Sequence, residues 1–226
     1  MSMLNAPHLE RAADGAVEAS RPRHTRGVYF AMALNAFLLG GSIMAFEMVS
    51  SRFISPYFGG GIFAWGAIIA TVLTGMSAGY VIGGVVADRL AGVGWFGALV
   101  VVAGVLVAAT PELVGLSFPL LMDGMEDMRW ASLCGAVIIL LLPTFVLAMH
   151  SPFEIRLLLR STAAAGRTVG LLNGIATLGA IFGTIGTSFF LIPSFGSRAL
   201  SVAIGCVVIV AGLVYIGVNA TVQRRR

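Results

Sequence analysis

Few residues of this chain can do chemistry, because only 11% of its positions are charged. Two of those charges stand close together at the end of an apolar run. Glu47 lies at the far end of the run that starts at Val28, and Arg52 follows five residues later, ahead of Pro56 and a run of three glycines at 59–61. On a helix Glu47 would be about 28 Å from Val28. We therefore expect it near the outer boundary of a membrane.

Two interpretations of Glu47 and Arg52 stay open. On a continuous helix their side chains would point about 140° apart. A direct ion pair between them therefore predicts that the helix ends or bends between the two residues, and Pro56 favours an early end. The alternative is that Glu47 and Arg52 contact a solute or substrate.

Other polar residues inside apolar runs are also candidates for substrate binding. Asn35 and Asn173 need buried partners, so they either line a polar path or bond across helices. Glu112 follows Pro111 and is expected toward the outer side. Asp88 and Arg89 stand at the inner end of their run.

Arrangements typical of enzymes are missing from the sequence. The glycines at 59–61 follow no strand and open no nucleotide-binding unit. His8 and His24 lie in the polar N-terminal segment, and His150 is interpreted as an interfacial residue at the cytoplasmic end of an apolar run. We therefore predict no catalytic residue, no metal site and no cofactor, and no catalysis by this chain alone.

The elements that must position these residues follow from composition. Hydrophobic residues make up 58% of 226 positions, and the mean hydropathy is +0.96. A membrane core of about 30 Å takes about 20 apolar residues per helix, which predicts an all-α integral membrane protein with six transmembrane helices. The apolar runs are about 28–50, 62–87, 94–121, 131–150, 168–192 and 198–220. We expect a disordered cytoplasmic tail at 1–27, a membrane domain at 28–220 and a basic cytoplasmic end at 221–226.

Arginines orient the chain, since it has no lysine. With both termini cytoplasmic, the inner side holds Arg11, Arg21, Arg23, Arg26, Arg89, Arg156, Arg160, Arg167 and the arginines at 224–226, while the outer side holds Arg52, Arg129 and Arg198. This excess is the pattern of short cytoplasmic loops in an inner membrane protein, and arginines spread over such loops do not form a nucleic-acid surface. The segment at 151–167 is either an amphipathic helix at the interface or an extension of the preceding helix.

Glycines four residues apart predict close helix packing. The second run has Gly75, Gly79 and Gly83, and the fifth has two pairs, Gly170 with Gly174 and Gly179 with Gly183. Such spacing aligns small residues on one stripe, where the backbones of two membrane helices can approach each other within one chain or between two chains. Two glycine-rich runs in corresponding positions also suggest a three-plus-three repeat.

Three passages carry a family resemblance. They are the segment from Glu47 and Arg52 to Trp65, the stretch GRTVGLLNGIATLGAIFGTIGTSFFLIPSFGSR, and GGVVADRL with Gly84, Asp88 and Arg89. The first two resemble the membrane half of fused major-facilitator-like and spermidine-synthase-like proteins, and the third has the form of the major-facilitator inner loop. The resemblance spans nearly all of 28–220. The resemblance implies half of a major-facilitator bundle and a latch formed by Gly84, Asp88 and Arg89. The soluble synthase domain of that family has no counterpart in this sequence.

The resemblance leaves two functional hypotheses. In the first, the chain is a membrane subunit that anchors a separately made synthase-like protein on its cytoplasmic face, or handles its substrate or product. In the second, it is a half-sized transporter of a small, cationic solute that works as a dimer. The first is favoured here, since the synthase association distinguishes the family from ordinary transporters.

Overall fold

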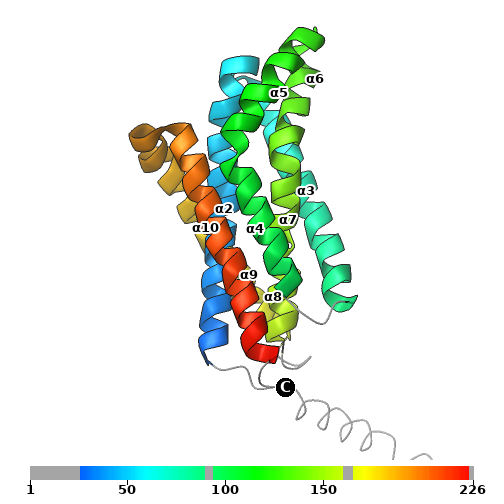
Figure 1. The fold of residues 1–226 in the computed structure, drawn as a ribbon, viewed down its shortest axis with the longest axis vertical. Coiled ribbons are helices and arrows are strands. Elements are labelled where there is room, and N and C mark those ends of the chain that lie inside the picture. The colour runs from blue at the N-terminus through cyan, green and yellow to red at the C-terminus, as the bar shows by residue number, and fades with distance from the viewer. Residues whose placement is uncertain (1–25, 90–93, 160–164, 224–226) are drawn as a thin grey trace, which may run out of the picture.

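The computed structural model describes residues 26–89, 94–159 and 165–223, and within these ranges the chain forms helices and no strand. In chain order the helices are α2 (Arg26–Phe58), α3 (Ile62–Arg89), α4 (Gly94–Ala108), α5 (Thr110–Gly124), α6 (Met128–Ala136), the π-helical turn η1 (Val137–Leu141), α7 (Leu142–Ala148), α8 (His150–Leu158), α9 (Ala165–Ile185), the π-helical turn η3 (Gly186–Leu191) and α10 (Ile192–Gln223). Figure 1 shows one elongated bundle. Residues 1–25 of the predicted tail, Arg160 and residues 224–226 lie outside the described residues, whereas residues 26–27 of that tail and 221–223 of the predicted basic end are helical.

Long apolar helices dominate the bundle. Within the described ranges, four are long and apolar enough to cross a membrane, namely Gly27–Phe58, Ile62–Arg89, Met128–Leu158 and Ala165–Thr221. The pair α4 and α5, bent by 59°, makes a fifth if it is counted as one span. The prediction of an all-helical chain with membrane-length helices is thus confirmed for these residues.

Helix termini gather at one end of the bundle, and chain reversals lie at the other. Helix α2 begins and α10 ends at the same end, where α3 also ends and α8 lies (Figure 1); we call this the terminal end. At the opposite end the chain turns back after α2 and again at Gly196, within α10. Gly59 and Gly196 have φ angles of 79° and 74°, a region open to glycine but strained for other residues. These two glycines allow the reversals.

Prolines explain where the helices break. A proline has no N–H to donate, and its ring crowds the carbonyl four residues earlier, so a helix loses a hydrogen bond about one turn before it. The bend at Ala109 precedes Pro111, and the π-helical turns η1 and η3 precede Pro143 and Pro193. The junction of α7 and α8 at Met149 precedes Pro152. Each break therefore has a local cause in the sequence.

Helix α2 forms the centre of the bundle and packs against α3, α9 and α10. Its buried side chains recur every three or four residues, as in Met32, Ala36, Leu39, Ile43 and Phe46. This spacing places them along one side of the helix. The continuous course of α2 to Phe58, about 50 Å at 1.5 Å per residue, carries this stripe along the length of the bundle.

Glycines bring the helices close together. A Cβ at Gly79 would lie 2.5 Å from the Phe145 carbonyl oxygen, and one at Gly83 would lie 3.0 Å from the Met149 backbone. Gly75 likewise faces Thr144, so this stripe of α3 packs against α7 and its junction with α8. A side chain larger than a hydrogen at these three positions would force a neighbouring helix or side chain to shift, because real Cβ contacts are longer than these distances.

Helix α9 uses only part of its glycine stripe. Gly179 and Gly183 face the backbone of α2 at Phe37 and Gly41. A Cβ at Gly170 or Gly174, in contrast, would meet no atom within 4 Å among the described residues. The second pair therefore forms a contact within this chain, whereas the first pair does not.

Candidate functional site

A cavity of about 490 Å³ lies between α2, α3, α8 and α9. Its lining comprises Gly40, Ile43, Met44, Met76, Tyr80, His150, Ser151, Pro152, Ile155, Asn173, Ala176, Thr177 and Ala180. Most of these residues are apolar, and a few polar groups converge on the same space, which is typical of small-molecule sites. The size suits a small organic solute.

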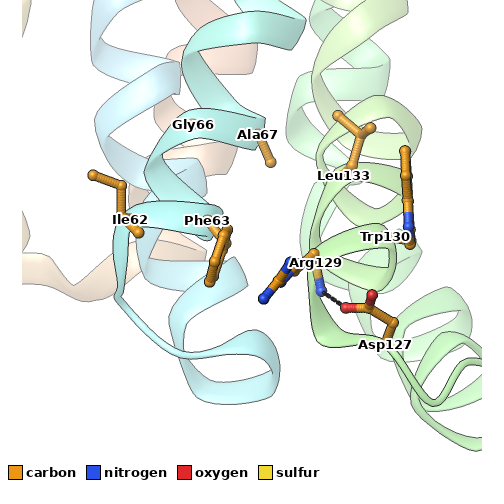
Figure 2. A pocket seen from close by; sticks show the side chains of 8 residues that line it. All are labelled: Ile62, Phe63, Gly66, Ala67, Asp127, Arg129, Trp130 and Leu133. Atoms are coloured by element: carbon orange, nitrogen blue, oxygen red, sulfur yellow. Dashed lines mark hydrogen bonds between the residues drawn. The ribbon is translucent and has the colours of Figure 1, made fainter.

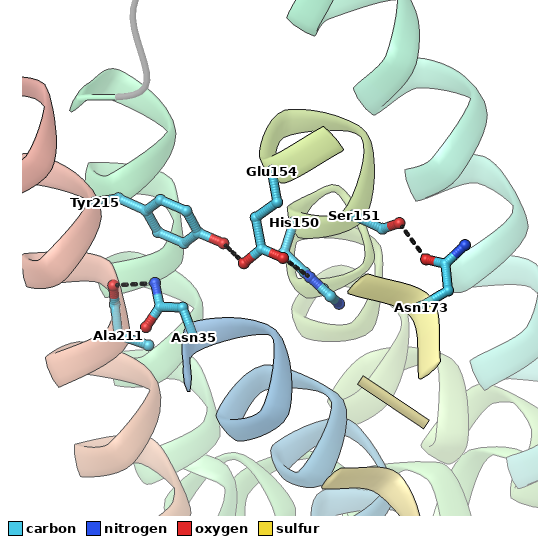
Figure 3. A network of polar contacts seen from close by, with 7 residues as sticks. All are labelled: Asn35, His150, Ser151, Glu154, Asn173, Ala211 and Tyr215. Carbon is cyan, nitrogen blue, oxygen red and sulfur yellow. Dashed lines mark hydrogen bonds and ion pairs between the residues drawn. The ribbon is translucent and has the colours of Figure 1, made fainter. Parts of the chain in front are cut away.

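Behind the cavity wall lies a buried chain of polar side chains (Figure 3). Glu154 is 1% exposed and His150 is 3% exposed. The His150 Nδ1 lies 3.4 Å from the Glu154 Oε2, and the Tyr215 hydroxyl donates a hydrogen bond of 2.5 Å to the Glu154 Oε1. His150 lines the cavity, whereas Glu154 does not. The imidazole thus connects the cavity to the buried carboxyl.

Local sequence explains one of the two contacts that Glu154 makes with buried polar side chains. His150 and Glu154 stand four residues apart on α8, which places them on one face of the helix. Tyr215 comes from α10, sixty-one residues away in the sequence, and reaches the same carboxyl from the opposite side. One partner is therefore set by helix periodicity and the other by helix packing.

Aromatic rings close this region off from water. Phe96 of α4 stacks on Phe153 at 4.4 Å between ring centroids, and it meets the Tyr215 ring at 5.1 Å. Trp95 packs on Phe153 at 5.4 Å. Because Phe153 precedes Glu154 in α8, the carboxyl lies next to an apolar aromatic layer.

The charge of the buried pair can be inferred from its surroundings. No arginine lies within ion-pair distance of Glu154 among the described residues. An isolated carboxylate at such a site costs several kcal/mol. A charged Glu154 would therefore need a positive partner, and among the described residues His150 is the side chain placed to supply one.

Both asparagines that the sequence analysis selected lie close to this site. Asn35 of α2 is buried, and its Nδ2 donates to the Ala211 carbonyl at 3.1 Å. Asn173 lines the cavity, and its Oδ1 accepts a hydrogen bond of 3.0 Å from Ser151. Asn35 thus bonds across helices, while Asn173 belongs to the cavity wall.

The predicted break between Glu47 and Arg52 is wrong. Helix α2 continues without interruption to Phe58, with Pro56 in its last turn. Pro56 leaves the preceding helix intact because its missing N–H costs only one bond near the end. The two side chains consequently point apart, Arg52 is exposed, and no ion pair joins them in the part of the chain that the structure describes.

Glu47 nevertheless has a defined relation to the cavity. It is 8% exposed, and none of the hydrogen bonds or ion pairs between described residues involves its carboxyl. Gly40, Ile43 and Met44 line the cavity from α2, and Glu47 follows them at three and four residues' spacing on the same face. It therefore lies one turn beyond the cavity, toward the end opposite the terminal end.

The other charged candidates form surface ion pairs. Glu112 of α5 accepts a 3.0 Å bond from Arg198 of α10, and both side chains are largely exposed. Asp88 lies 3.8 Å from Arg156 of α8 at the terminal end. Gly84 has open space at its Cβ position, and Arg89 is exposed. Of the predicted latch, Asp88 is therefore the residue seen to connect α3 to another helix in the part of the chain that the structure describes.

Sequence reasoning missed the centre of the site. The interfacial position of His150 stays a prediction, but its side chain is buried inside the bundle. Glu154 and Tyr215 were not selected. The segment that starts at 151 follows the second of its two predicted alternatives, because it extends the preceding helix through Leu158. The four-residue spacing of His150 and Glu154 could have predicted this contact, because residues four apart lie on the same face of a helix.

A second, more open cavity of about 390 Å³ lies between α3 and α6 (Figure 2). The Arg129 guanidinium lies over the Phe63 ring at 4.7 Å, and Asp127 accepts a 2.9 Å bond from the Arg129 backbone N–H. Trp130 is largely exposed beside them. Aromatic rings next to an arginine are typical of membrane boundaries. This second cavity is therefore a weaker candidate for a binding site than the cavity beside His150.

Comparison with protein-family models, curated proteins and solved structures finds no match to this chain. The family resemblance therefore stays a prediction. Within the described ranges, no group of three or more His, Cys, Asp or Glu side chains is arranged to hold a metal ion. The function must be argued from the cavity and the buried polar chain.

Proposed function

We propose that this chain is an integral membrane protein of six spans that binds a small polar or cationic solute in the cavity between α2, α3, α8 and α9 and moves it across the membrane. The observation that carries the proposal is the cavity itself, because its wall includes the imidazole of a buried acid and base pair. Ionisable groups buried within a membrane are costly and commonly mark solute or proton pathways.

Two features of the helices support the proposed six spans. An unbroken helix over Ala165–Thr221 would measure about 85 Å, far more than a membrane core. Gly196 interrupts it with non-helical backbone, so we count two spans there. The bent pair α4 and α5 counts as one. The excess of arginines predicted at the terminal end then supports cytoplasmic termini in an inner membrane.

Dimerisation is part of the same proposal. Six spans correspond to half of a major-facilitator bundle, and the half-sized transporter of the sequence hypothesis works as a pair. Gly170 and Gly174 have open space on α9 beside the cavity-lining Asn173. Small residues four apart suit close contact between helices in lipid, so we place a second copy against this part of α9.

The anchoring hypothesis is the second candidate. Its support is the terminal end, where Arg89 and Arg167 are exposed and have no ion-pair partner among the described residues. A synthase-like protein docked there would contact cytoplasmic arginines. A simple anchor, however, needs neither a solute-sized cavity nor a buried acid, which is why the solute-binding proposal is now favoured.

A thermal-shift experiment tests the proposal. Purified protein in detergent is heated with a panel of polyamines and S-adenosyl compounds, and a bound solute should raise the unfolding temperature. Thr177→Leu fills part of the cavity and should abolish the response. Thr74→Leu is the matched control, since both threonines are exposed and donate to the carbonyl four residues earlier, at 2.8 Å and 2.7 Å, but Thr74 does not line the cavity.

Either of two results would count against solute binding. One is a panel in which no compound, cationic or neutral, stabilises the wild-type protein. The other is an equal response from Thr177→Leu and Thr74→Leu, which would place the solute elsewhere. If the protein co-purifies with a soluble synthase-like protein and no compound of the panel raises its unfolding temperature, the anchoring hypothesis is favoured instead.

A further inference from the structure

The buried pair faces neutral groups on nearly every side. From α10 comes the Tyr215 hydroxyl, from α2 the Asn35 amide, and from α4 the Phe96 ring. Helix α3 places Tyr80 in the cavity wall, and α9 places Asn173 there. On α8 itself, the described cation is Arg156, which is exposed and pairs with Asp88 of α3.

Among the described residues, protons are then the means of balancing the charge of Glu154. With one proton, the His150 and Glu154 pair is neutral overall, whichever atom carries it. Removing that proton leaves a buried negative charge, which is strongly unfavourable unless a positive charge replaces it nearby. The cavity is where such a charge has access, because His150 forms part of its wall.

We infer that the His150 and Glu154 pair is a proton-binding site whose proton is exchanged for a monovalent cation in the cavity. When the cation enters, the N–H or O–H bond of the pair breaks and the proton passes to water. When the cation leaves, the pair takes a proton back. The total charge of the site stays constant, and no electrons are transferred. This inference rests on the proposed solute cavity and names its solute class and its coupling ion.

The test places a permanent charge in the cavity without needing the natural solute. Thr177→Cys provides an attachment point in a background where Cys134 and Cys206 are replaced by alanine. The protein in weakly buffered detergent near neutral pH is treated with a trimethylammonium-ethyl methanethiosulfonate or with its neutral hydroxyethyl analogue. Both reagents release the thiol proton, so this part of the signal cancels in the comparison.

We expect the cationic reagent to release up to about one proton more per chain than the neutral reagent. The extra proton should disappear in Glu154→Gln, because His150 can then stay neutral without a buried negative charge. Glu112→Gln is the control, since it makes the same chemical change in an exposed ion pair. It should keep the extra proton.

The failures of the two proposals are distinguishable. Complete modification with equal proton release by both reagents would overturn the proton site and leave solute binding standing. No modification by either reagent would mean that water does not reach the cavity, which contradicts the proposed function itself. The comparison of the two reagents on Thr177→Cys alone decides the inference, so it does not depend on how well Glu154→Gln folds.

Discussion

The buried carboxyl of Glu154 has partners of two kinds. His150 is close in sequence and reaches it through helix periodicity, whereas Tyr215 reaches it from α10. Together they satisfy both carboxyl oxygens in a region closed off by aromatic rings. At the residue scale, the account therefore depends on hydrogen bonds whose loss leaves a buried polar atom without a partner.

Tyr215→Phe should destabilise the protein. The change removes the donor to the Glu154 Oε1 and leaves a buried acceptor unsatisfied, which costs about 1–3 kcal/mol. Thermal unfolding in detergent should show a fall of several degrees. Tyr57→Phe is the control, since the part-buried Tyr57 packs edge-on against Phe118 at 5.3 Å and should change the midpoint little. Equal effects of the two changes would show that the Tyr215 hydroxyl contributes nothing.

Glu47→Gln should leave the fold intact. Its carboxyl has no ion pair to lose among the described residues, and the amide has nearly the same shape, so we expect only a small change in stability. If Glu47 contacts a cation that enters beyond the cavity, the variant should fold but lose the solute response in the thermal-shift panel. A large drop in expression and unfolding temperature would instead assign Glu47 a structural role.

At the scale of helices, prolines and glycines decide the architecture. Four breaks precede Pro111, Pro143, Pro152 and Pro193. Close approaches occur at glycines, and one such seam was not predicted from the sequence. Gly97 and Gly104 of α4 face Gly212 and Gly205 of α10, where added Cβ atoms would lie 2.6–2.8 Å from backbone oxygens. On each helix the two glycines are seven residues apart rather than four, so the four-residue spacing used to predict close helix packing does not detect them.

Gly104→Ala should loosen the seam between α4 and α10. The new methyl group would lie 2.8 Å from the Gly205 carbonyl oxygen, so the helices must move apart at a cost of about 1–3 kcal/mol. Gly115→Ala, on α5, has open space at the same position and should be neutral or slightly stabilising. Unfolding midpoints of both variants, measured in the same detergent, check this. An unchanged midpoint for Gly104→Ala would contradict the close contact.

At the scale of the whole molecule, composition and hydropathy were enough to predict long apolar helices, since each must fill a membrane core. They also located the helices to within several residues. They were not enough to predict which helices touch, because the contact of Glu154 with Tyr215 joins residues far apart in the chain. The cavity, likewise, arises from four helices, and its polar wall mixes the predicted Asn173 with the unpredicted His150.

Gly174→Leu tests the proposed pairing of two copies. The Cβ of a leucine there would meet no atom within 4 Å among the described residues, so the monomer should fold normally while a dimer through α9 should dissociate. Gly217→Leu is the control on α10, also at an open position. Light scattering of the purified variants should then give a monomer for the first and a dimer for the second. A dimer in both cases would place the interface elsewhere.

Access of water to the cavity tests the central claim most directly. Thr177→Cys and Thr74→Cys, each in the background without Cys134 and Cys206, are reconstituted in liposomes with a charged methanethiosulfonate on both sides of the membrane. We predict rapid modification at position 177, in the cavity, and little at position 74, outside it. Equal rates at the two positions, or no reaction at 177, would contradict a solute-binding cavity in this protein.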